Sequence, residues 1–330
     1  MEVLYMKEKI IIVGAGPCGL STALYLKEAG YDPLIIDRGN IVHTIYRFPT
    51  HQTFFSTSEK LEIGNMPFVS PNSKPVRMEA LSYYREVVKR NNLRIHPYEE
   101  VIDVQKESTR ISVTTLKNGH QHVYEASFVV MATGYYDQPQ WMGIKGEHLE
   151  KVSHYFKEAH PYFGTDVVVI GGKNSAVDAA LELYHAGANV TVFYRGKDYS
   201  PSIKPWILPE FDSLVQKGEI QMHFNVNVLE IKETTMIYEL DGKQYSIPND
   251  FIFAMTGYKP NISFLEKCHI QIDKETGRPI KNDATFETNI ENIYVAGVII
   301  SGYNGNETFI ENGRFHGGKI AAAIIEKCKK

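Results

Sequence analysis

Residues 10–37 read IIIVGAGPCGLSTALYLKEAGYDPLIID, and this stretch decides the fold class. The continuous β-branched run over 10–13 predicts a strand that is buried on both faces of a parallel sheet. Apolar residues then recur at helical spacing at Leu20, Ala23 and Leu24, and Gly30 predicts the end of that helix. A second apolar run, 33–36, predicts the next strand. Strand, glycine-rich turn, helix and strand in this order are typical of a dinucleotide-binding unit.

The turn after the first strand has the spacing G-x-G-x-x-G, and it contains Gly14, Gly16, Pro17, Cys18 and Gly19. Glycine at these positions permits a tight turn, close approach of the backbone to a pyrophosphate, and close helix packing. Asp37 follows the second strand, 23 residues after Gly14. A carboxylate there accepts hydrogen bonds from an adenosine ribose and repels a 2′-phosphate. The first unit is therefore predicted to bind FAD or NAD. A glycine-rich turn of some other α/β protein is the alternative.

Residues 167–176 read VVVIGGKNSA, a second buried-strand run followed by a glycine-rich turn. The candidate phosphate-binding residues of this turn are Gly171, Gly172, Lys173, Asn174, Ser175 and Ala176. After a predicted helix and a strand over 189–194, we expect Arg195 to take the position that Asp37 has in the first unit. A cation there, with Lys197 nearby, favours NADPH. Lys173 stands where the motif has its second glycine, so a degenerate repeat that binds no nucleotide is the alternative.

Two such units, the first suited to FAD and the second to NADPH, predict a flavoprotein reductase rather than a simple dehydrogenase. Two further predicted strands, 128–132 and 251–255, run into crossover turns, whose residues are Thr133, Gly134, Thr256 and Gly257. We therefore predict an α/β fold with two Rossmann-like dinucleotide-binding domains. The FAD-binding domain is discontinuous, residues 1–137 and 261–330, and residues 138–260 form the NADPH-binding domain.

Composition and charge exclude several classes of protein. The chain has 330 residues, of which 43% are hydrophobic and 22% charged, so it has enough apolar residues for a large core. Its net charge of −4 and the lack of long basic blocks argue against a nucleic-acid partner. No apolar run reaches the ~18 residues that cross a bilayer, and no signal peptide is readable, so we expect a soluble, cytoplasmic protein without a membrane partner. Association into a homo-oligomer stays open.

Three cysteines, Cys18, Cys268 and Cys328, are too few and too far apart to suggest a disulfide framework or a metal site. Cys268 is predicted to lie in a surface turn and Cys328 near the end of the chain, so neither is expected to take part in catalysis. Cys18 alone lies in a cofactor motif.

Over nearly its whole length the chain resembles the thioredoxin-reductase-like flavoproteins, and among them the bacillithiol disulfide reductases. The matching motifs lie at 14–20, 132–135, 171–176, 256–260 and 294–297. The resemblance implies NADPH-dependent reduction of bacillithiol disulfide, a small-molecule substrate, through FAD. No CxxC occurs in the sequence, which excludes a thioredoxin reductase with an internal dithiol. The chain also departs from the family pattern after Gly297. Val298 stands where the pattern has an Asp on the flavin ribityl chain, so that contact is backbone-made or absent.

The resemblance also implies further cofactor contacts. Pro49, Thr50 and Phe54 would shape the flavin pocket, with ordinary core packing as the alternative, and the role of His51 stays open. Val101 would contact adenine through its backbone. A last helix over 314–329, reached through a loop over 304–313, would point its N-terminus at the flavin.

Cys18 is the candidate catalytic nucleophile. Its thiolate would attack one sulfur of the substrate, release one thiol and leave a mixed disulfide for the reduced flavin to resolve. A helix N-terminus lowers the pKa of a thiol, whereas a neighbouring pyrophosphate opposes the thiolate. The alternative is that position 18 requires only a small side chain. Two other functions also stay open: a flavin-dependent monooxygenase, and a redox-sensing flavoprotein without turnover.

Overall fold

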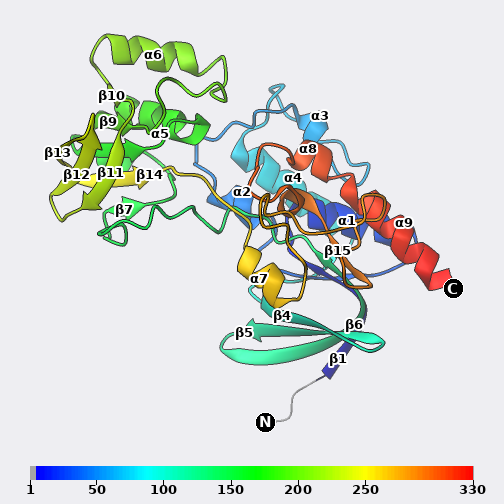
Figure 1. Cartoon of the computed structure of the whole chain (residues 1–330). Coiled ribbons are helices and arrows are strands. Elements are labelled where there is room, and N and C mark those ends of the chain that lie inside the picture. The colour runs from blue at the N-terminus through cyan, green and yellow to red at the C-terminus, as the bar shows by residue number, and fades with distance from the viewer. Residues whose placement is uncertain (1–4, 330) are drawn as a thin grey trace. The chain divides into compact units, whose positions relative to one another are not determined.

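The computed structural model describes residues 5–329 and divides into two compact units (Figure 1). Unit 1 comprises Met1–Gln138 and Tyr258–Lys330, and unit 2 comprises Pro139–Gly257. Each unit combines helices with a sheet that contains adjacent parallel strands, so the predicted α/β fold class is confirmed. Within the described residues, no helix is both long and apolar enough to cross a membrane.

Unit 1 is organised around a seven-stranded sheet with the order β3-β2-β1-β6-β5-β4, in which β15 also pairs with β6. The strands are β1 Tyr5–Val13, β2 Leu34–Ile36, β3 Arg94–His96, β4 Glu100–Glu107, β5 Arg110–Lys117, β6 His120–Met131 and β15 Ile293–Val295. Pairing is parallel among β3, β2, β1, β6 and β15, and antiparallel where β6, β5 and β4 follow one another. The carboxyl ends of the parallel strands meet at one edge, where ligands bind in such sheets.

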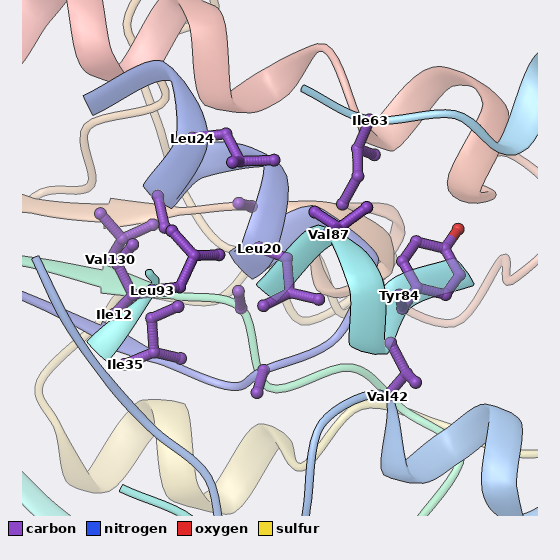
Figure 2. Close-up of a cluster of buried hydrophobic side chains, with 14 of the residues drawn as sticks. Ile12, Leu20, Leu24, Ile35, Val42, Ile63, Tyr84, Val87, Leu93 and Val130 are labelled. Atoms are coloured by element: carbon purple, nitrogen blue, oxygen red, sulfur yellow. The ribbon is translucent and has the colours of Figure 1, made fainter. Parts of the chain in front are cut away.

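The β-branched run in β1 forms a strand because both of its faces are covered. Ile10 and Ile12 belong to one buried cluster, and Ile11 and Val13 belong to the other. Two helices, α1 Pro17–Glu28 and α4 Arg77–Arg90, contribute to the first cluster (Figure 2). The cluster also includes residues of α9 His316–Lys329. The second cluster includes residues of β4 and β5 and of α7 Ile262–Lys267. This two-sided burial is what the continuous apolar run predicted.

Unit 2 repeats the arrangement with a five-stranded parallel sheet of order β10-β9-β8-β14-β7. Its strands and helices are β7 Val152–Ser153, η1 His160–Tyr162, β8 Asp166–Ile170, α5 Asn174–His185, β9 Asn189–Phe193, α6 Leu208–Gln216, β10 Gln221–His223 and β14 Phe251–Ala254. A separate antiparallel sheet is formed by β11 Asn227–Ile231, β12 Thr235–Leu240 and β13 Lys243–Pro248.

Two local predictions are wrong. Cys268 does not lie in a surface turn. It is 1% exposed at the C-terminal end of α7, because it packs into the second cluster of unit 1. The second wrong prediction concerns the loop over 304–313, which contains the short helix α8 Ile310–Gly313, and the final helix begins at His316; η2 Gly297–Ser301 lies before that loop. Between β2 and α4 the chain also forms two short helices, α2 His43–Arg47 and α3 Ser58–Leu61. Single helical turns are too short to show a periodic pattern.

Candidate functional site

The first glycine-rich turn packs tightly against the strand ends of unit 1. Gly14 has φ +111°, and a Cβ there would lie 2.3 Å from the carbonyl oxygen of Ala132 in the β6 crossover. A Cβ on Gly19 would lie 2.0 Å from the carbonyl oxygen of Gly14, so this glycine lets α1 approach the turn. Gly16 differs from both, because a Cβ there would meet nothing within 4 Å. Gly16 therefore faces the open side of the turn, where a pyrophosphate would lie.

Asp37 is held at the end of β2, directly beside this turn. Its Oδ2 accepts a hydrogen bond from the Ala15 amide at 2.6 Å, and its Oδ1 accepts one from the Gly39 amide at 2.7 Å. Burial raises the pKa of the Asp37 carboxyl above its usual value, although both backbone N–H groups oppose that rise. Each oxygen keeps acceptor capacity for a ribose hydroxyl.

A cavity of about 110 Å³ opens beside Asp37 within unit 1. It is lined by Val13, Gly14, Ile36, Asp37, Arg38, Glu100, Val101, Thr133, Gly134, Tyr135, Asp137, Gln138, Asn261 and Phe264. The structure thus brings together five residues that the sequence placed in a cofactor site: Gly14, Asp37, Val101, Thr133 and Gly134. A Cβ on Gly134 would meet nothing within 4 Å, so its backbone is open to the cavity. The glycine turn, the carboxylate and this space fit the adenosine end of FAD.

Cys18 lies in the first turn of α1, against the last segment of the chain. A Cβ on Gly313 would lie 2.8 Å from Cys18 Sγ, and one on Gly297 would lie 3.2 Å from it. Burial raises the pKa of the thiol to about 12, and the negative charge of Glu311 adds to the shift. The Ser56 hydroxyl donates a hydrogen bond to Glu311. Without a cofactor bound, the thiol is therefore protonated at neutral pH, and the helix N-terminus does not overcome the cost of burial.

The residues expected around the flavin are not all equally exposed. Phe54 is buried in the first core cluster of unit 1, as the packing alternative predicts, while Pro49 is half-buried and Thr50 is exposed. The Gly297 amide donates a hydrogen bond to His316 Nδ1 at 3.1 Å, and Val298 is half-buried in η2. His316 was not among the candidates, because its partner lies 19 residues away in the sequence and no local pattern connects them.

The second glycine-rich turn presents cations at the carboxyl end of the unit 2 sheet. Lys173 is the N-cap residue of α5, and the side chains of Lys173, Ser175, Arg195 and Lys197 are exposed. Ala176 is buried against the helix. A loop of this kind, with cations that face solvent, fits a dinucleotide phosphate.

Asn174 uses its side chain inside the protein. Its amide nitrogen donates to the Ser202 carbonyl at 2.9 Å, and its Oδ1 accepts from the Lys204 amide at 2.9 Å. In the crossover turn, Thr256 Oγ1 donates to the Gln140 carbonyl at 2.6 Å, and the Gln140 amide donates to the Gly257 carbonyl at 2.9 Å. These side chains therefore hold loops next to the turn, and a contact to the nucleotide would come from their backbone.

The prediction that Arg195 stands at the Asp37 position is wrong by one residue. The Gly14 amide donates to the Ile36 carbonyl in unit 1, and the Gly171 amide donates to the Phe193 carbonyl in unit 2. Ile36 and Phe193 are thus equivalent, so Tyr194 corresponds to Asp37 and Arg195 corresponds to Arg38.

The Tyr194 ring lies against both neighbouring loops of unit 2. A Cβ on Gly172 would be 2.2 Å from one ring atom, and a Cβ on Gly196 would be 2.4 Å from another. Gly172 therefore provides the space for this ring. The sequence did contain the signal, since 23 residues separate Gly171 from Tyr194, as they separate Gly14 from Asp37.

The paired glycine turns, each on its own parallel sheet, have counterparts in known proteins. The sequence profile of the pyridine nucleotide-disulphide oxidoreductases matches residues 11–297. The chain belongs to this family. Pyridine nucleotide-disulphide oxidoreductases use FAD and NAD(P)H, so the prediction of an oxidoreductase with these cofactors is confirmed.

Among individual proteins, the chain is 57% identical to the Bacilliredoxin reductase Bdr of Bacillus subtilis (strain 168), over 98% of this chain and 99% of that one. It is 58% identical to the solved Bacillithiol Disulfide Reductase Bdr (YpdA) from Bacillus cereus, with a TM-score of 0.96 and coverage of 98% and 100%. A flavin monooxygenase from Stenotrophomonas maltophilia is 18% identical, with a TM-score of 0.77 and coverage of 98% and 99%. That likeness shows the fold alone.

Proposed function

We propose that this pyridine nucleotide-disulphide oxidoreductase uses NADPH to reduce bacillithiol disulfide through FAD. The observation that carries the proposal is the similarity along the whole chain to a solved bacillithiol disulfide reductase. The sequence supports it, because a chain without CxxC has no internal dithiol to pass electrons to a protein disulfide. In this proposal unit 1 holds FAD and unit 2 holds NADPH.

In the overall reaction, one NADPH and one proton reduce one disulfide to two thiols, and NADP⁺ is the other product. When bound, FAD would supply the two-electron relay between the nicotinamide and sulfur. In unit 1, the turn 14–19 would hold the pyrophosphate and Asp37 the ribose. Cys18 is proposed as the nucleophile toward the disulfide. Because its thiol is neutral at pH 7, Cys18 must lose its proton before it attacks the disulfide.

The proposal is tested by following NADPH oxidation by the FAD-loaded protein with three disulfides. We expect turnover with bacillithiol disulfide. For glutathione disulfide and oxidised thioredoxin, we expect kcat/KM to be at least ~100-fold lower, a difference of about 2.8 kcal/mol. Oxygen uptake should stay at the background level in all three assays. Turnover with none of the disulfides would contradict the proposal, and stoichiometric oxygen consumption with a substrate would favour a monooxygenase.

The choice of dinucleotide is also predicted to depend on two adjacent residues of unit 2. Replacing Arg195 with leucine removes a charge-assisted hydrogen bond to a 2′-phosphate, so the KM for NADPH should rise roughly 10–100-fold while that for NADH barely changes. Tyr194→Asp places a carboxylate at the position of Asp37, and it should shift the preference toward NADH. Steady-state kinetics with both nucleotides measure this, with Lys217→Leu at the exposed end of α6 as the control.

A further inference from the structure

A buried carboxylate lies behind the Asp37 loop and belongs to none of the motifs. Glu99 is 1% exposed and directly precedes β4. Its Oε1 accepts hydrogen bonds from the Thr115 hydroxyl on β5 and the Tyr124 hydroxyl on β6, each at 2.7 Å. Lys117 Nζ and His96 Nδ1 each lie 3.4 Å from its Oε2. The side chain of Glu99 is therefore tied to the antiparallel part of the sheet.

This carboxylate is charged despite its burial. Burial by itself raises the pKa of Glu99, but the hydrogen bonds from Thr115 and Tyr124 and the neighbouring His96 and Lys117 outweigh it and hold the pKa below its usual value. An ion pair with a buried carboxylate contributes little net stability, because the desolvation of that charge offsets the attraction to its partner. Stability alone therefore does not explain a charge at this position. A role in fixing the geometry of the surrounding backbone explains it better.

The backbone around Glu99 holds the loop that carries Asp37. The Glu99 amide donates to the Asp37 carbonyl at 3.0 Å, and the Asp37 amide donates to the His96 carbonyl at 3.1 Å. The Tyr98 amide donates to the Gly39 carbonyl at 2.8 Å. Three hydrogen bonds thus join the turn 96–99 to the loop 37–39. Val101 lies two residues after Glu99 and lines the same cavity as Asp37.

We propose that Glu99 is a positioning residue for the adenosine half of FAD. Glu99 anchors the turn 96–99 to β5 and β6. This turn then positions Asp37 to contact the ribose and Val101 to contact the adenine. This inference rests on the proposed binding of FAD in unit 1. It does not depend on which disulfide is the substrate.

The test compares binding of FAD and of ADP to the apoprotein by isothermal titration calorimetry. ADP has the adenosine and pyrophosphate of FAD but no flavin. In Glu99→Ala, we expect the Kd of FAD to rise ~10–100-fold, the range of a lost hydrogen bond to a charged group, and the Kd of ADP to rise by the same factor. The visible spectrum at saturating FAD and the Kd of NADPH should not change. Glu107→Ala removes an exposed carboxylate at the far end of β4, the strand that follows Glu99, and is the matched control.

The apoprotein of Glu99→Ala could melt at a lower temperature while its Kd for FAD is unchanged. This result would show that Glu99 has only a structural role, and it would overturn the inference. Weaker FAD binding with unchanged ADP binding would also overturn it. If Glu99→Ala does not fold, Thr115→Val and Tyr124→Phe each remove one hydrogen bond and keep the carboxylate. For each we expect a several-fold rise in Kd that is equal for FAD and ADP, and a lack of any rise in both variants would overturn the inference. Disulfide turnover does not enter these measurements, so they separate this inference from the proposed substrate.

Discussion

Alanine at Gly16 should leave the apoprotein as stable as the original chain and remove most of its FAD binding. Gly16 has φ −74° and ψ 173°, a conformation that alanine adopts without strain, and a Cβ there would touch no protein atom within 4 Å. The added methyl group would instead occupy the space over the turn where the pyrophosphate approaches. We expect the Kd of FAD to rise at least ~100-fold, a loss of about 2.8 kcal/mol. Flavin fluorescence during titration measures it.

Gly19→Ala is the matched variant with the opposite expectation for the apoprotein. Its Cβ would lie 2.0 Å from the Gly14 carbonyl oxygen, so α1 must move away from the turn. Overpacking of this kind costs about 1–3 kcal/mol, more than the gain of ~1 kcal/mol for alanine over glycine in a helix. Urea unfolding of the apoprotein should therefore give a lower free energy of unfolding for Gly19→Ala and an unchanged one for Gly16→Ala. Equal destabilisation by both would contradict the assignment of Gly16 to the ligand side of the turn.

Replacing Cys18 with alanine should lower turnover of bacillithiol disulfide at least ~100-fold if this thiol attacks the substrate, because the covalent step is lost. FAD content and NADPH oxidation with ferricyanide as the acceptor should persist, since neither needs the thiol. Cys328→Ala, a partly buried cysteine that no proposed step uses, should keep full activity. Undiminished disulfide turnover in both Cys18→Ala and Cys18→Ser would instead identify position 18 as a packing position.

The pKa of Cys18 gives a second measurement on the same thiol. Burial favours the neutral thiol and raises its pKa to about 12, so below that value the thiolate fraction increases tenfold with each pH unit. Alkylation of Cys18 in the apoprotein by iodoacetamide, followed by mass spectrometry, should therefore be slow at pH 7 and about 100-fold faster at pH 9. Because the folded-state pKa lies above the unfolded value, the contribution of Cys18 to stability is complete below pH 9 and decreases as the pH rises above it. A rate independent of pH over this range would contradict the raised pKa.

Local sequence patterns predicted the parts of this protein that depend on near neighbours. The run Ile10–Val13, the glycine turn and the periodic residues of α1 act over a few positions, and the same holds for 167–187 in unit 2. The fold class and the family are confirmed. The binding roles of individual residues, the division of FAD and NADPH between the two units, and the nucleophile stay predictions.

The sequence by itself determined two buried strands with glycine turns, because strand and helix periodicity and the freedom of glycine are local properties. The 23-residue spacing already favoured Tyr194 as the counterpart of Asp37, and the tertiary structure established it, because hydrogen bonds between distant strands align Phe193 with Ile36. Only the tertiary structure decided that Cys268 is buried and that the pKa of Cys18 is raised. Glu99 meets Thr115 and Tyr124 only after the sheet has formed. Burial and charge depend on groups far apart in the chain, which no local pattern connects.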